Sequence, residues 1–289
     1  MTTITGAPVV VGIDSSAGAL AAVRVAAREA RLRHRGLRIV HAFTWPPTRW
    51  NAPPRWAAVA PDACRAQTRF VLAQAARTAR RVAPGVDLTG VIAEGQPAPV
   101  LLAESEHAML VVVGSRAGGG LPGMLIGSVA GLDLADARSP VLVVRGRPNP
   151  DGPVIVGVNG SRTSTAAVDF AAEEATLRNT DLVAVHAWSD DDTTELTGPV
   201  RDTSELEERV LAEASAGLTA RFPDLRVRPQ VRRGSARHLL RDWSQTAQLI
   251  VVGTRRPGGF AERLPGSVSH YLLRRAACPT VVVGAAKPE

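Results

Sequence analysis

Two glycine-rich stretches of matching spacing are the part of the sequence best suited to hold a ligand. They read "VVVGSRAGGGLPGMLIGSVA" at residues 111–130 and "VVGTRRPGGFAERLPGSVSH" at residues 251–270. In each, a valine-rich run ends in glycine, a loop follows, and Gly-Ser comes just before a segment with helical spacing. Glycine allows close backbone approach, and the N–H groups of a helix N-terminus favour an anion. The pattern indicates a phosphate-binding loop, and tight turns with serine as a helix cap are the alternative.

The better-known phosphate and catalytic motifs do not fit these loops. A Walker A loop needs Gly-Lys-Ser/Thr, but the single lysine of the chain is Lys287. A dinucleotide-binding GxGxxG would follow the first strand, where the sequence has "GIDSSAG". GxSxG and HExxH motifs are absent, and Cys64 and Cys278 lie far apart in the sequence, which favours buried or unused thiols. We therefore assign no catalytic residue and no metal ligand.

The charge of the chain is positive but scattered along the sequence. The net charge is +7 over 289 residues, and 33 of the 34 basic residues are arginine. Because these arginines are interleaved with Asp and Glu, and aromatic residues are few, we expect no sequence-specific nucleic-acid binding. No apolar run approaches the roughly 20 residues of a membrane-spanning helix, and the N-terminus lacks a signal pattern. We expect a cytoplasmic protein that does not associate with membranes.

The chain contains an internal duplication. Residues 9–45 align with residues 154–190 at an offset of 145, and the later glycines and prolines align at an offset of 139. The join "RGRPNPDGP" (145–153) is short, polar and rich in proline and glycine, which is typical of a linker. The sequence therefore predicts two domains, at residues 1–147 and 152–289.

Each copy alternates short apolar runs with amphipathic segments. In the first copy we expect strands at "PVVVGID", "LRIVHAF", "VDLTGVIA", "MLVVVGS" and "PVLVVRG", and helices at 17–34, 62–82, 97–107 and 128–137. The second copy repeats the strands near 153–159, 182–188, 226–231, 248–253 and 279–284. Nearly continuous apolar runs are typical of strands buried on both faces, and their alternation with helices predicts an α/β fold with a parallel, doubly wound sheet. Such sheets bind ligands at the carboxyl ends of their strands.

The glycine loop resembles the nucleotide loop of the universal stress protein family. That loop has glycine, two residues, a small residue, nine residues and then Gly-Ser, as in Gly114–Ser128, and "VVVGID" and "IVHA" are also similar to the family. The resemblance covers essentially the whole chain twice, as in tandem-domain members from actinobacteria. It implies two tandem Rossmann-like (adenine nucleotide α-hydrolase-like) domains, each a five-stranded parallel sheet with helices on both faces.

The same resemblance implies a function. It implies that the protein binds ATP, either with or without Mg²⁺. It also implies that the protein is a nucleotide-dependent regulator of the stress and dormancy response and is not an enzyme. A nucleotide-free interaction scaffold and a slow ATP-hydrolysing or adenylating enzyme are the alternatives. The resemblance also implies pairing between domains through the last strands, "PVLVVRG" and "PTVVVGA", as a homodimer or an intramolecular pseudo-dimer. A protein partner is expected, but the sequence does not identify it.

The family pattern assigns binding residues position by position. The adenine and ribose would be held by Ile13, Asp14, Val40 and Ala42, and in the second copy by Val158, Asn159, Val185 and Ala187. The phosphates would be held by Gly114, Gly127, Ser128 and Val129, and in the second copy by Gly253, Gly266, Ser267 and Val268. The same loops contain Arg116, Ala117 and Arg255, of which the two arginines either reach a phosphate or project into solvent. For Asp14, a role as N-cap of the helix beginning near Ala17 is an equally open alternative.

The two copies depart from the family pattern in different ways. The second glycine of the family loop is Ala117 in the first copy and Arg256 in the second, and Asn159 replaces the carboxylate of Asp14. We therefore expect the first site to bind ATP at least as tightly as the second. For the tryptophan- and proline-rich segment 44–61, three roles are open: to cover the ligand, to anchor a partner, or to pack onto its own domain. Its counterpart at 189–205 is acidic instead.

Overall fold

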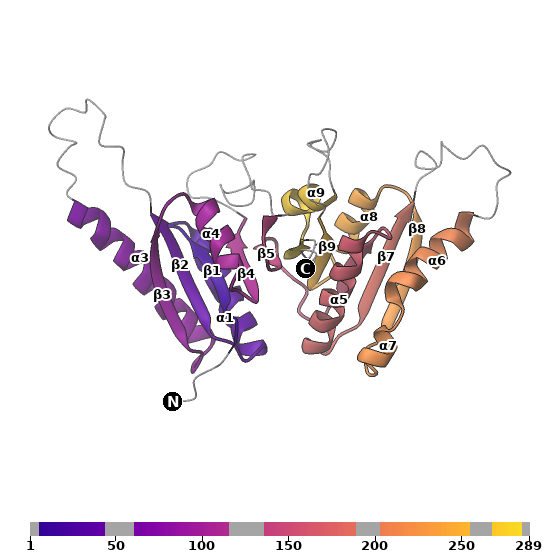
Figure 1. Cartoon of the computed structure of the whole chain (residues 1–289), viewed down its shortest axis with the longest axis horizontal. Helices are drawn as coiled ribbons and strands as arrows, with labels where there is room; N and C mark the ends of the chain where they lie inside the picture. Colours follow the sequence, from indigo (N-terminus) through magenta and orange to yellow (C-terminus); the bar gives the residue numbers. More distant parts are fainter. Residues whose placement is uncertain (1–5, 44–60, 116–135, 189–202, 255–267, 285–289) are drawn as a thin grey trace, which may run out of the picture. The chain divides into compact units, whose positions relative to one another are not determined.

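The computed structural model describes residues 6–43, 61–115, 136–188, 203–254 and 268–284 (Figure 1). The chain divides into two compact units, Met1–Leu132 and Asp133–Glu289. In each unit mostly parallel strands alternate with helices, which confirms the predicted α/β fold.

The first unit has a parallel sheet with a deeply buried centre. Its elements are β1 (Val9–Ile13), α1 (Ala17–Leu32), β2 (Leu37–Phe43), α3 (Pro61–Val82), β3 (Leu88–Glu94), α4 (Pro97–Ser105) and β4 (Leu110–Gly114). The strands lie in the order β3-β2-β1-β4, and β1 pairs in parallel with both β2 and β4. Residues 9–11 of β1 and 110–113 of β4 are at most 2% exposed. This burial explains their unbroken apolar sequence, because both faces of the central strands are covered.

Helices cover the two faces of this sheet. A Cβ atom at Gly12 would lie 2.7 Å from a methyl carbon of Leu101 in α4, whereas the next residue, Ile13, lines a pocket with α1 and α3. Successive side chains of a strand point to opposite faces. It follows that α4 covers one face and that α1 and α3 cover the other.

The second unit repeats this arrangement and adds one antiparallel strand. Its elements are β5 (Val141–Val144), β6 (Val154–Val158), α5 (Arg162–Leu177), β7 (Leu182–Trp188), α6 (Thr203–Ser215), α7 (Leu218–Arg221), β8 (Val227–Arg233), α8 (Ala236–Trp243), β9 (Leu249–Gly253), α9 (Val268–Arg275) and β10 (Thr280–Val283). The strand order is β5-β10-β9-β6-β7-β8. β5 is antiparallel to β10, with Val143 opposite Thr280. The strands of "PVLVVRG" and "PTVVVGA" therefore pair with each other inside the second unit, although the first of them belongs to the first copy in sequence. Pairing between domains, as a homodimer or a pseudo-dimer, stays a prediction.

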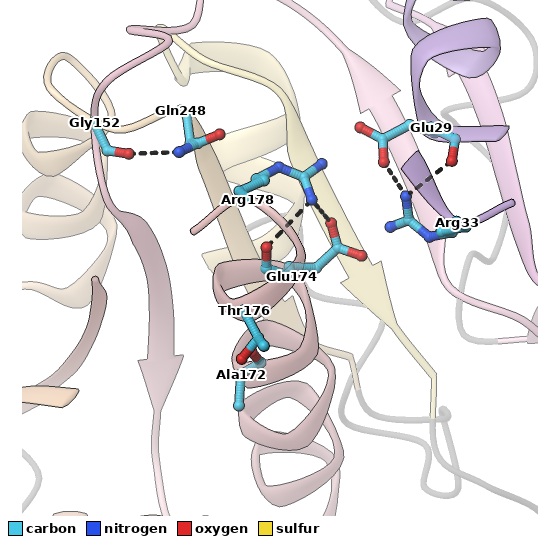
Figure 2. Close-up of polar contacts among 8 residues, drawn as sticks. All are labelled: Glu29, Arg33, Gly152, Ala172, Glu174, Thr176, Arg178 and Gln248. Carbon is cyan, nitrogen blue, oxygen red and sulfur yellow. Dashed lines mark hydrogen bonds and ion pairs between the residues drawn. The ribbon is translucent and has the colours of Figure 1, made fainter. Parts of the chain in front are cut away.

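The join between the copies is bound to the second unit. Asn149 Nδ2 donates to the carbonyl of Thr246 at 3.2 Å. Gln248 Nε2 donates to the carbonyl of Gly152 at 2.7 Å (Figure 2). A Cβ atom at Gly152 would lie only 2.1 Å from the carbonyl oxygen of Thr246, so this approach requires glycine. The predicted linker is thus held by hydrogen bonds to the second unit.

The first helix of each repeat ends with the same kind of buried ion pair. Arg33 pairs with Glu29 at the end of α1, and Arg178 pairs with Glu174 at the end of α5 (Figure 2). Each arginine is the C-cap residue and also donates to a carbonyl of the last turn at 3.4 Å. A cation at this position complements the helix dipole, and the pairing offsets the cost of burying the carboxylate. These four charged residues therefore have a structural role.

The second long helix differs between the repeats. α3 is continuous, whereas its counterpart is divided into α6 and α7 at Gly217, which has φ +78°. This left-handed backbone favours glycine and commonly ends a helix. The position equivalent to Gly217 in α3 is Thr78, which continues the helix. The helix predicted at 128–137 lies largely outside the described residues.

None of the described helices combines sufficient length with sufficient apolar character to cross a bilayer.

Candidate functional site

In the second unit, six of the predicted binding residues line one pocket. The pocket lies at the carboxyl ends of β6, β7 and β9 and at the start of α9. The predicted residues that line it are Val158, Asn159, Val185, Ala187, Gly253 and Val268. The sequence analysis did not identify the remaining lining residues, which are Gly157, Thr163, Ser164, Ala236, Leu240 and Val252. The structure therefore brings together all the predicted residues of the second copy that it describes.

The pocket has apolar walls and a small polar rim. Val185, Leu240 and Val252 form much of the wall, and the polar side chains come from Asn159 and from the first turn of α5. No described lining residue carries a titratable side chain. The volume is about 90 Å³, which is below the roughly 300–1,000 Å³ of sites that enclose a whole drug-sized ligand. The described part of the pocket therefore suits one flat apolar group, such as a ring.

The alternation of side chains along β7 determines which residues reach the pocket. Val185 and Ala187 line it, but His186 between them faces the opposite side of the sheet. There His186 Nδ1 lies 2.8 Å from the carbonyl oxygen of Val158, and Nε2 contacts the carboxyl of Glu207 in α6. His186 is therefore a buried structural contact between β7 and α6.

Asp14 and Asn159 hold the cap of the following helix in the same way. Asp14 Oδ1 accepts from Ser16 N at 2.9 Å and from Ser16 Oγ at 2.5 Å. Asn159 Oδ1 accepts from Ser161 N at 3.2 Å and from Ser161 Oγ at 2.7 Å. The N-cap residues are Ser16 and Ser161, so the alternative that made Asp14 itself the N-cap is wrong. Asp14 and Asn159 instead position the capping serine.

The first loop glycine of each repeat has a packing role independent of any ligand. A Cβ atom at Gly114 would lie 2.9 Å from the carbonyl oxygen of Gly18. A Cβ atom at Gly253 would lie 2.5 Å from the carbonyl oxygen of Thr163. In both repeats the end of a central strand thus packs directly on the first turn of a helix. Sequence reasoning correctly suggested close backbone approach at these glycines, but the neighbouring backbone belongs to the protein itself.

In the first unit the predicted residues are divided between two places. Ile13 and Asp14 line a pocket of about 250 Å³ with residues of α1 and α3, including Leu20 and Gln74. Val40, Ala42 and Gly114 are not among the described residues that line this pocket. Val40 lies beside Gly12 in the register of β1 and β2.

The other predicted loop residues lie outside the described part of the chain. These are Arg116, Ala117, Gly127, Ser128, Val129, Arg255, Gly266 and Ser267. Most of the tryptophan- and proline-rich segment, at residues 44–60, also lies outside it.

Cys278 is a buried free thiol, as the sequence analysis predicted. Burial raises its pKa from 9.0 to about 12, so the reactive thiolate is disfavoured. Among the described residues, no group of three or more His, Cys, Asp or Glu side chains is arranged to hold a metal ion.

Comparison with known sequences identifies the repeated domain. A model of the universal stress protein family matches residues 7–145 and again residues 152–284. The universal stress protein Rv2623 of Mycobacterium tuberculosis (strain H37Rv) is 39% identical over 289 residues, covering 95% of each chain. A universal stress protein of Mycolicibacterium smegmatis is 35% identical over 283 residues, covering 95% of this chain and 96% of its own.

Solved structures have the same fold over nearly the whole chain. A universal stress protein from Archaeoglobus fulgidus has a TM-score of 0.69 at 18% identity, covering 96% of this chain and 98% of that one. A putative universal stress protein from Pseudomonas aeruginosa has a TM-score of 0.59 at 16% identity, covering 98% and 94%. The family model matches both copies, and the mycobacterial relative that is 39% identical covers 95% of the chain. The chain therefore belongs to the universal stress protein family, as a tandem of two family domains.

Proposed function

We propose that the pocket of the second unit binds the adenine end of ATP, and that the chain acts as an ATP-dependent regulator of a stress response. One observation carries the proposal: six residues that the family pattern assigns to a nucleotide line a single pocket at the carboxyl ends of the strands. This is the edge at which doubly wound sheets bind nucleotides. Membership of the universal stress protein family supports the same assignment.

The lining residues suggest how each part of the nucleotide is held. The purine ring packs between Val185, Leu240 and Val252, whose apolar surfaces suit its flat faces. Because Asn159 Oδ1 is taken by Ser161, its Nδ2 is the atom left to donate to the ribose or the base. In the first copy Asp14 uses Oδ1 in the same way, so its second carboxylate oxygen is left to accept from ribose hydroxyls.

The phosphates would extend from Gly253 toward the N-terminus of α9, which begins at Val268. Exposed N–H groups at a helix start favour phosphate oxygens. A Mg²⁺ ion brought in with ATP would rest on phosphate oxygens and water, because no carboxylate belongs to the described lining.

We propose that the nucleotide is bound without rapid turnover. Fast phosphoryl transfer commonly uses a lysine at the phosphates and a residue that positions the attacking water. The single lysine, Lys287, lies in the C-terminal tail, and the described pocket lining contains no general base. Steady release of phosphate or pyrophosphate above background would contradict this part of the proposal.

Calorimetric titration of the full chain with ATP tests the pocket directly. Ala187→Phe places a ring in the pocket, so we expect the second site to lose at least about tenfold in affinity. Ala216→Phe makes the same change at an exposed position near the end of α6 and should leave ATP binding unchanged. Unaltered ATP binding by a folded Ala187→Phe chain would overturn the assignment.

A nucleotide-free interaction scaffold is the competing function. It is favoured by the close packing of Gly253 on the carbonyl oxygen of Thr163, which requires glycine whether or not a nucleotide binds. The scaffold predicts that neither the wild-type chain nor its variants take up ATP, so the same titration separates the two functions.

A further inference from the structure

A groove between α1 and α3 of the first unit is lined mainly by arginine. Arg24 comes from α1, and Arg77, Arg80 and Arg81 come from α3. The groove has a volume of about 520 Å³, and no carboxylate belongs to its described lining. The positions 77, 80 and 81 are three and four residues apart, which places their side chains on one face of the helix.

The four guanidinium groups are available to a ligand. All four side chains are exposed, and none of them forms an ion pair or hydrogen bond with another described residue. Several arginines elsewhere do have carboxylate partners, including Arg38 with Glu104 and Arg228 with Asp181. The groove therefore concentrates positive charge that no described residue neutralises.

The equivalent positions of the second unit do not carry these arginines, and the arginine present on that face, Arg221, is paired with Asp169. Arg24 corresponds to Asp169 at the offset of 145 that relates α1 to α5. At the offset of 139 that relates α3 to α6 and α7, the three remaining groove arginines correspond to Ala216, Thr219 and Ala220. The arginines are thus not required by the repeated fold, and the two faces have different electrostatic character.

We propose that this groove binds a compact chain of linked phosphates. Planar guanidinium groups form paired hydrogen bonds with phosphate oxygens, and four of them neutralise a ligand with several closely spaced charges. The volume lies within the range of small-molecule sites, whereas a longer polymer would need basic surface beyond the groove. The groove shares no residue with the proposed nucleotide pocket of the second unit. It adjoins the pocket that Ile13 and Asp14 line in the first unit, because Leu20 and Gln74 line both.

Inorganic tripolyphosphate is the probe, titrated into the full chain by calorimetry at about 0.1 M salt, where distant surface charges are largely screened. Arg24→Asp introduces the residue of the second repeat, and Arg77→Glu reverses a charge on α3. We expect each to weaken binding by about tenfold or more, as the loss of a charged hydrogen bond predicts. The matched control is Arg69→Glu, because Arg69 is exposed on the same helix, does not line the groove and corresponds to Glu208. It should weaken binding by less than about threefold.

A second comparison separates this groove from the nucleotide sites. The chain with both Gly127→Glu and Gly266→Glu should bind tripolyphosphate as tightly as the wild type. The proposal is overturned if that chain loses the binding, or if Arg69→Glu weakens it as much as Arg24→Asp does. It is also overturned if no binding occurs at about 1 mM tripolyphosphate. Tighter binding of single-stranded oligothymidylate, lost in the same arginine variants, would replace the proposal with a nucleic-acid groove.

Discussion

Asp14 and Asn159 form the same local hydrogen bonds although one side chain is charged and the other is neutral. Each accepts two hydrogen bonds from the serine that caps the next helix, through its Oδ1 atom. The difference between the repeats is therefore concentrated in the remaining side-chain atom, an anionic oxygen in Asp14 and an amide nitrogen in Asn159. Equivalent geometry with different hydrogen-bonding character predicts that the two sites make different polar contacts with the same nucleotide.

Gly253→Ala tests the close approach of β9 to α5. Its new methyl group would lie 2.5 Å from the carbonyl oxygen of Thr163, so the strand or the helix has to shift. We expect a loss of about 1–3 kcal/mol in the free energy of unfolding, as is typical of overpacking. Urea unfolding measures it.

Gly36→Ala is the control for this substitution, because the nearest atom to its new Cβ is a carbonyl oxygen at an ordinary 3.6 Å. It should change the free energy of unfolding by less than about 1 kcal/mol. Equal effects of the two substitutions would contradict the packing role of Gly253.

Cys278 should make stability depend on alkaline pH. Its pKa is raised from 9.0 to about 12, so the native state keeps the proton longer than the unfolded chain does. The contribution is fully present below about pH 9 and is lost as the pH rises toward 12, by up to about 1.4 kcal/mol per pH unit. Between about pH 8 and pH 10.5, wild type should lose about 2 kcal/mol more than Cys278→Ala. Parallel pH profiles for the two chains would refute this.

At the scale of the elements, His186 and Glu207 link β7 to α6. Both ring nitrogens of the buried His186 face oxygen acceptors. The position equivalent to Glu207 in the first repeat is Thr68, which has no carboxylate. The second repeat therefore connects this helix to the sheet through a histidine–carboxylate contact that the first repeat does not have at the equivalent position.

Glu207→Leu leaves one nitrogen of His186 without its acceptor. We expect a cost of about 1–3 kcal/mol in the free energy of unfolding, the usual penalty for an unsatisfied buried polar group. Glu208→Leu is the control, because Glu208 is the exposed neighbouring residue on α6. Urea unfolding of both variants measures the difference, and a similar cost for the two would show that the His186 contact contributes little.

The elements also show what sequence patterns can predict. The valine-rich runs located the central strands, because strands buried on both faces require continuous apolar sequence. The outer strands β3 and β8 are mixed in sequence and largely exposed or half-buried. The division of α6 from α7 was not predicted, because it depends on the left-handed backbone of Gly217. Leu240 and Thr163 were missed as pocket residues because they come from helices that approach the strand ends only in the folded chain. The arginine groove was missed for the same reason, since Arg24 lies far in sequence from Arg77.

At the scale of the whole molecule, the chain uses one fold twice and gives each copy a different surface. The pocket that we propose binds a nucleotide belongs to the second unit, and the arginine-lined groove belongs to the first. Sequence reasoning predicted that the first site binds ATP at least as tightly as the second, and this stays a prediction because its loop lies outside the described residues. Titration of Gly127→Glu and Gly266→Glu chains tests the ranking, and equal losses would contradict it.

The most direct test of the central claim is to identify the nucleotide held by the purified chain. The protein is equilibrated with ATP, desalted and denatured by heat, and the released small molecules are identified by chromatography and mass spectrometry. We expect an adenine nucleotide in a fixed molar ratio to the chain, and a lower ratio for Ala187→Phe than for Ala216→Phe. A wild-type chain that releases no nucleotide after this loading would contradict the proposed function.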